Sequence, residues 1–324
     1  MKDATRLKPT KTFEEKMQDI LAFRSEIYGL CALWIIFFHI SDRVPVPFSP
    51  NIITPLIRMG NCCVDIFLFL SGYCLVLSWE KNFNLTVKSR FAYFYKRRFL
   101  RLIPPYIVLS TPFYFWKYMW GFSAPKVDLG EKFNLIGFLG DLSTVNFWLK
   151  GMQTTWFVCA ILVFYLFFPL LYGICKKHFL VGLSLILACY AALIAMIFLD
   201  MNLFWKIGIA VSRIPAFVSG ITLAIYRKKI NTDSVFYRII RTLLLCAFIV
   251  FVFLFPIKNF ALKHFNRFRS PVIWCSYLYF IPGFLLCLKF LFERLPAFLR
   301  KAIYMVGGGY FRVVYDSCLY TSSY

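Results

Sequence analysis

The chain has 324 residues, of which 60% are hydrophobic and 20% aromatic, and its mean hydropathy is +0.68. A water-soluble globular chain carries about 45–50% apolar residues, so this composition indicates a protein that crosses a membrane several times. No polar stretch is long enough to form a separate soluble domain. We therefore expect an all-α, polytopic bundle of about nine to ten transmembrane helices with no soluble domain.

The formal net charge is +22, from 37 Lys and Arg against 15 Asp and Glu. Such a charge can attract nucleic acid, but no nucleic-acid motif accompanies it, and the basic residues lie in short segments between apolar runs. The positive-inside rule and attraction to anionic lipid account for this pattern. We therefore expect membrane lipids, and no nucleic acid, among the partners.

The 11 cysteines lie mostly inside apolar runs, with no CxxC pair and no cluster with histidine. This pattern favours small buried side chains and predicts neither a metal site nor a disulfide framework.

Residues 1–25 form a basic N-terminal segment that lacks the apolar core of a signal peptide. Apolar runs of spanning length follow it. They cover residues 27–44, 60–79, 103–120, 154–174, 180–199, 203–226, 241–257, 272–292 and 302–320. Lys and Arg concentrate in the N-terminal segment and in alternate links, which predicts a multi-pass protein of the cytoplasmic membrane with its N-terminus in the cytoplasm.

The chain closes with VGGGYFRVVYDSCLYTSSY, which begins like a helix and then turns polar and stops. We place the membrane domain at 26–320 and expect its last helix to be truncated or altered.

The first apolar run, EIYGLCALWIIFFHIS, carries His39 near one end. A histidine in such a run either faces a cavity or lies at the headgroup interface. His39 is 13 residues beyond Glu26, or roughly 20 Å along a helix, and Asp65 lies at a comparable depth in the second run. Asp65 could then orient His39 as a general base. Alternatively, Asp65 is an interfacial helix cap.

The segment FAYFYKRRFLRLIPPY contains Arg97, Arg98 and Arg101. Arg98 and Arg101 are three residues apart and share a helix face. Arginine forks suit phosphate oxygens, although an amphipathic anchor on anionic lipid would need only the charge.

Two further residues are candidates for a site. Arg213 lies in the middle of a span, where an arginine must pair or line a cavity, and Trp156 lies at an expected outer interface, where an aromatic belt is the simplest explanation.

Together these blocks resemble the membrane acyltransferase 3 family, bacterial multi-span enzymes that O-acylate cell-surface glycans. Five blocks match in order over about residues 24–300: EIYGLCALWIIFFH, VDIFLFLSGYCL, YKRRFLRLIPPY, TTWFVCAILVFYLFFPLL and SRIPAFVSGITLA. The resemblance implies a catalytic role for His39, Asp65 and Arg213. It also implies that Arg97, Arg98 and Arg101 bind acyl-CoA. Glu26, Ser71 and Trp156 complete the set of candidate site residues.

The resemblance implies an acyl-CoA-dependent O-acyltransferase, which we expect to O-acetylate a sugar of a surface polysaccharide or of its lipid-linked precursor. The partners are then acyl-CoA, as donor substrate rather than permanently bound cofactor, and a carbohydrate acceptor. Two alternatives stay open. A multi-span transporter or exporter would also explain a buried Arg213 and Asp65, and an altered last helix would fit an inactive family member.

Overall fold

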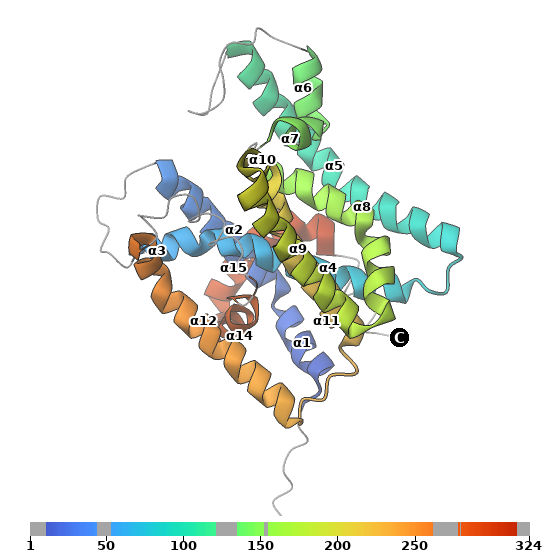
Figure 1. Cartoon of the computed structure of the whole chain (residues 1–324), viewed down its shortest axis with the longest axis vertical. Coiled ribbons are helices and arrows are strands. Elements are labelled where there is room, and N and C mark those ends of the chain that lie inside the picture. Colours follow the sequence, from blue (N-terminus) through green and yellow to red (C-terminus); the bar gives the residue numbers. More distant parts are fainter. Residues whose placement is uncertain are drawn as a thin grey trace, which may run out of the picture. The chain divides into compact units, whose positions relative to one another are not determined.

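The computed structural model describes residues 11–43, 53–120, 135–151, 155–261, 278 and 280–315. These residues form helices and carry no β-strand, as the all-α prediction requires (Figure 1). The chain divides into two compact units. One comprises Met1–Ser71 with Thr222–Tyr324, and the other comprises Gly72–Ile221. Each unit is described by itself below.

The first unit contains α1 (Phe13–Ala22), α2 (Arg24–Arg43), α3 (Ile53–Arg58), the 3-10 turn η1 (Met59–Cys62), α12 (Val235–Ala261), α14 (Phe280–Arg294) and α15 (Ala297–Tyr315). The second contains α5 (Val87–Trp120), α6 (Leu135–Leu142), α7 (Val145–Lys150), α8 (Trp156–Lys177), α9 (Phe179–Leu199) and α10 (Met201–Val211). Helices α4 (Cys63–Lys81) and α11 (Ile214–Tyr226) each contribute residues to both units.

Helix α1 opens the described chain with a capping box, in which the Thr12 hydroxyl accepts from the backbone N–H of Glu15 and the Glu15 carboxylate accepts from that of Thr12. Its acidic side chains bind basic residues far along the chain. Arg227 Nε lies 2.9 Å from Glu14, and Lys289 Nζ lies 3.0 Å from Asp19. The polar N-terminal segment therefore ends in a helix attached to the first unit.

Helices α2 and α15 pack together through two glycines. A Cβ atom built on Gly29 would lie 2.2 Å from the carbonyl oxygen of Ile303, and one on Gly307 would lie 2.0 Å from that of Ser25. Small residues at such positions let two helix backbones approach closely, as is common between transmembrane helices. The glycines that begin the closing run thus belong to a packed helix, while residues 316–324 of that run lie outside the described residues.

The second unit is held by an aromatic cluster between α4, α5 and α8. The Trp79 indole lies edge-on to Phe94 and Phe168, at centroid distances of 5.3 and 5.9 Å, and Phe94 stacks on Phe168 at 5.1 Å. Aromatic pairs in these geometries add packing energy beyond the area that they bury. The cluster fixes the end of α4 against the beginning of α5.

Four helical stretches in the described chain are long and apolar enough to cross a membrane: Leu56–Lys81, Trp156–Lys177, Phe179–Leu199 and Met201–Tyr226. A bent pair, Phe13–Ala22 with Arg24–Ser41, raises the number to five. The expected nine to ten spans are therefore not confirmed. One reason is that α5 joins the basic segment and the expected third span into a single 34-residue helix containing Pro104, Pro105 and Pro112. The run 272–292 lies partly outside the described residues.

Candidate functional site

Arg213 occupies a break in the last span of the second unit, between the end of α10 at Val211 and the start of α11 at Ile214. Its side chain is 0% exposed. A guanidinium does not lose its proton in proteins, so this is a positive charge held inside the unit. Its Cζ atom lies 6.0 Å from the centroid of the Trp156 ring. The sequence placed Trp156 in an interfacial belt, whereas the structure sets it against the buried arginine.

A buried polar network lies next to Trp156 in the chain. The Tyr114 hydroxyl and the Thr155 hydroxyl are 2.5 Å apart, and Tyr106 donates to the carbonyl oxygen of Asp141 at 3.1 Å. The Asp141 carboxylate, only 2% exposed, accepts from Lys117 Nζ at 3.0 Å and from Asn146 Nδ2 at 2.8 Å. Four helices contribute to it: α5, α6, α7 and the start of α8.

None of these network residues was predicted from the sequence. The available signal was the pair Asp141 and Asn146 in an otherwise apolar part of the loop between spans, together with Lys117 inside an apolar run. Such residues at membrane depth are costly unless paired, which marks them as structural or functional. The network anchors the first turn of α8, the turn that carries Trp156.

His39 lies four residues before the end of α2 and its side chain is exposed. Its ring makes an edge contact with Phe38, at a centroid distance of 5.1 Å. Asp65, in contrast, is 2% exposed in the first turn of α4. Within the described residues, no hydrogen bond or ion pair joins His39 to Asp65.

The register of α2 explains the separation. Tyr28 contacts Phe67 at a ring-centroid distance of 5.2 Å, and the free thiol of Cys31 lies beside that of Cys63. Asp65, between positions 63 and 67, is therefore level with residues 28–31. His39 is eight residues beyond Cys31, or about 12 Å along the helix. The expectation of equal depth is not met, because α2 and α4 pair two to three turns away from the predicted alignment.

The remaining predicted residues divide between the units. Glu26 is buried in the first turn of α2, within reach of the positive charge of Arg300 on α15. Ser71 is half-buried in α4. In the second unit, Arg98 is buried while Arg97 and Arg101 are half-buried.

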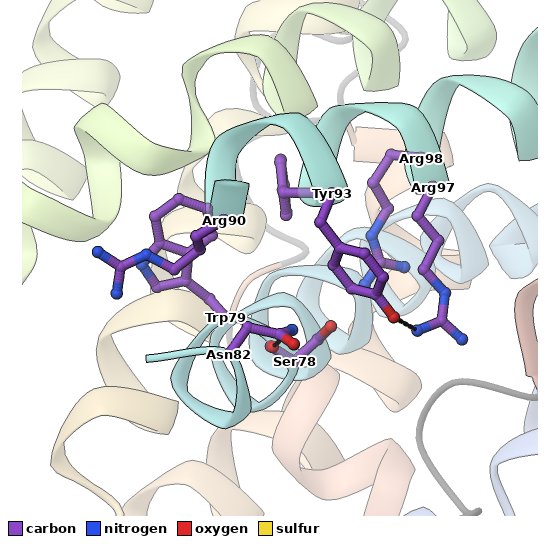
Figure 2. Close-up of a pocket in the computed structure, with 8 residues that line it drawn as sticks. Ser78, Trp79, Asn82, Arg90, Tyr93, Arg97 and Arg98 are labelled. Carbon is purple, nitrogen blue, oxygen red and sulfur yellow. Dashed lines mark hydrogen bonds between the residues drawn. The ribbon is translucent and has the colours of Figure 1, made fainter. Parts of the chain in front are cut away.

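Arg97 and Arg98 belong to a pocket formed by the end of α4 and the first three turns of α5 (Figure 2). Its lining consists of Ser78, Trp79, Asn82, Arg90, Tyr93, Phe94, Arg97 and Arg98. Arg101, the expected partner of Arg98, does not line it, whereas the unpredicted Arg90 does. Side chains with three positive charges, two hydroxyls and an amide suit a phosphate or another oxyanion.

The described residues contain no group of three His, Cys, Asp or Glu side chains that could hold a metal ion.

These features define an all-helical membrane protein with buried polar sites between its helices. A family model described as an acyltransferase domain matches residues 29–315 of the chain. The chain belongs to the acyltransferase 3 family and is an acyltransferase. Neither the search of curated proteins nor that of solved structures gives a match.

Proposed function

We propose that the protein is an acyl-CoA-dependent O-acyltransferase that O-acetylates a sugar of a surface polysaccharide or of its lipid-linked precursor. The observation that carries the choice of donor is the arginine pocket of α5, because coenzyme A presents phosphate groups that guanidinium forks bind well. Arg97 and Arg98 contact these phosphates, and Arg101, one turn beyond Arg98 on the same face, contributes its charge.

In the proposed reaction, His39 Nε2 or Nδ1 takes the proton from a sugar hydroxyl while that oxygen attacks the thioester carbonyl. The new C–O bond forms, the C–S bond breaks, and the coenzyme A thiolate leaves and takes the proton back from His39. Arg213 offsets negative charge on the tetrahedral oxygen or on a phosphate. With Asp65 level with residues 28–31, the direct Asp65–His39 hydrogen bond is left out of this scheme.

The test uses membranes that contain the protein, radiolabelled acetyl-CoA and the host's surface glycan. If His39 is the base, His39→Ala lowers label transfer about 10²–10⁴-fold. His178→Asn is the matched control. It removes an imidazole whose Nδ1 caps α9 by accepting from the Leu180 N–H, and asparagine keeps a cap there. If both variants transfer label at the wild-type rate, the protein is an acyltransferase but His39 is not its general base.

One observation favours a second candidate, a transporter or exporter. Transporter sites are often built where the backbone of a transmembrane helix is irregular, and Arg213 lies at the two-residue turn between α10 and α11 within the span Met201–Tyr226. In proteoliposomes, a transporter would move the glycan across the bilayer without acyl-CoA, whereas an acyltransferase would modify it only when acyl-CoA is present. Glycan movement without label transfer would therefore decide for the transporter.

A further inference from the structure

Helices α6 and α7 belong to the link between the expected spans 103–120 and 154–174, but the surface that they expose is apolar (Figure 1). Their large exposed side chains have exposed fractions from 50% to 81%, and they are Leu135, Ile136, Leu139, Val145 and Leu149. The charged side chains of this segment are Asp141, which is buried, and Lys150, the last residue of α7. A link that lay in water would carry polar side chains on this face, so the apolar surface indicates a binding partner.

The polar side chains of the two helices form their hydrogen bonds within the protein. Besides its bond to Asp141, the buried Asn146 amide donates to the carbonyl oxygen of Gly137 at 3.0 Å. The Ser143 hydroxyl donates to the carbonyl oxygen of Gly140 at 3.2 Å. The two helices therefore combine an apolar outer surface with polar groups that are bonded inside.

The turn between the helices, Ser143–Thr144, is also bonded within the protein. The backbone N–H of Ser143 donates to the carbonyl oxygen of Leu139 at 2.8 Å, and that of Thr144 donates to the carbonyl oxygen of Asp141 at 3.2 Å. The Asp141 carbonyl oxygen also accepts from the Tyr106 hydroxyl. Inside hydrocarbon each backbone polar group needs such a partner, because no water is present. The end of α6 can therefore lie away from water without losing these hydrogen bonds.

The contacts with α5 show at which depth the two helices lie. Tyr106 donates to the Asp141 carbonyl oxygen and Lys117 donates to the Asp141 carboxylate, so Asp141 is level with residues 106–117 of α5. Over this part, α5 exposes apolar side chains that are four and three residues apart on one face: Leu109, Phe113 and Trp116. A bilayer that covers this stripe of α5 also reaches α6 and α7.

We infer that α6 and α7 form a re-entrant hairpin whose apolar face binds the acyl chains of membrane lipids. The helices have 8 and 6 residues, or about 12 and 9 Å, whereas the hydrocarbon core is about 30 Å thick. Neither helix spans this core, so the hairpin enters one leaflet and returns to the side at which α5 ends and α8 begins. A stable protein interface needs about 20–30 residues on each side, more than the hairpin has, which favours lipid over a protein partner.

Photo-crosslinking of the purified full chain tests this inference without relying on the proposed reaction. The chain is reconstituted in vesicles of phosphatidylcholine and phosphatidylglycerol. The photoreactive residue p-benzoylphenylalanine, which inserts into nearby C–H bonds, replaces Ile136 on α6 or Leu149 on α7. Leu187, 68% exposed in the span Phe179–Leu199, is the control for lipid contact. Lys228, exposed in the turn between α11 and α12, is the control for contact with water.

The mass of the irradiated protein should show lipid adducts at Ile136 and Leu149 with a yield that matches Leu187, and a loss of adducts at Lys228. The two test positions are exposed and lie on different helices, so a local disturbance at one of them does not alter the result at the other. Lipid adducts at Leu187 without adducts at Ile136 and Leu149 would place the hairpin in water and overturn the inference. Crosslinked dimers at Ile136 and Leu149 in place of lipid adducts would also overturn it and assign the face to a second copy of the chain.

Discussion

Replacing Gly307 with alanine tests the closest helix contact in the first unit. The added Cβ atom would lie 2.0 Å from the carbonyl oxygen of Ser25 and 2.7 Å from the backbone nitrogen of Gly29. Ordinary contact begins at 3.4 Å, so α2 and α15 must separate by about 3.4 − 2.0 = 1.4 Å. Both neighbouring atoms are backbone atoms and cannot rotate away. Overpacking of this kind costs about 1–3 kcal/mol or more, whereas alanine gains roughly 1 kcal/mol of helix propensity over glycine.

Gly173→Ala on α8 is the matched control, because a Cβ atom at Gly173 meets nothing within 4 Å. Thermal unfolding in detergent, followed by tryptophan fluorescence, should give a Tm for Gly307→Ala that is about 2–8 °C below that of the control. Gly29→Ala should behave similarly, since its Cβ atom would lie 2.2 Å from the carbonyl oxygen of Ile303. Equal unfolding temperatures for Gly307→Ala and Gly173→Ala would refute the packing of α15 against α2.

Three further substitutions test the polar sites and the first helix. Lys117→Met removes the ion pair of the buried Asp141 and should lower the free energy of unfolding by about 3 kcal/mol. The double variant with Asp141→Asn should recover part of this stability. If the effects of the two substitutions simply add, the two side chains do not interact. Thr12→Ala removes the cap of α1 and should cost about 0.5–2 kcal/mol, seen as faster amide exchange confined to α1. Arg213→Lys keeps the charge but loses the planar group over Trp156; acetyl transfer should fall at least about ten-fold at unchanged protein abundance, and an unchanged rate would separate Arg213 from the chemistry.

Hydropathy predicted the most apolar helices well. The expected runs 180–199 and 203–226 agree with Phe179–Leu199 and Met201–Tyr226 to within two residues. They are found because their average apolarity is high over a full span. The same average misses the break at Arg213, because one polar residue and one proline change it little. It also separates the basic segment from the third run, whereas the structure has one helix, α5.

The sequence could not predict which side chains meet. The pairing of Arg213 with Trp156 depends on the packing of two spans, and the Asp141 network joins residues of four helices. Counting residues from each predicted helix end placed His39 and Asp65 at equal depth. The alignment is set instead by close packing, in which Gly60 lies against the backbone of Trp34, and the Trp34 indole donates to the Leu56 carbonyl oxygen at 2.9 Å. If α2 were shifted along its neighbour by one helical turn, every hydropathy average would stay the same, so hydropathy cannot report the alignment.

The contacts of α1 also fix an order of events during synthesis. The basic partners of Glu14 and Asp19 are synthesised 213 and 270 residues after them. At about 5–20 residues per second, Lys289 is added roughly 14–54 s after Asp19. During this interval, the ion pair between Asp19 and Lys289 cannot form. Docking of the N-terminal helix is therefore a late step of assembly, and it reports that α14 has been made and has reached its place in the first unit.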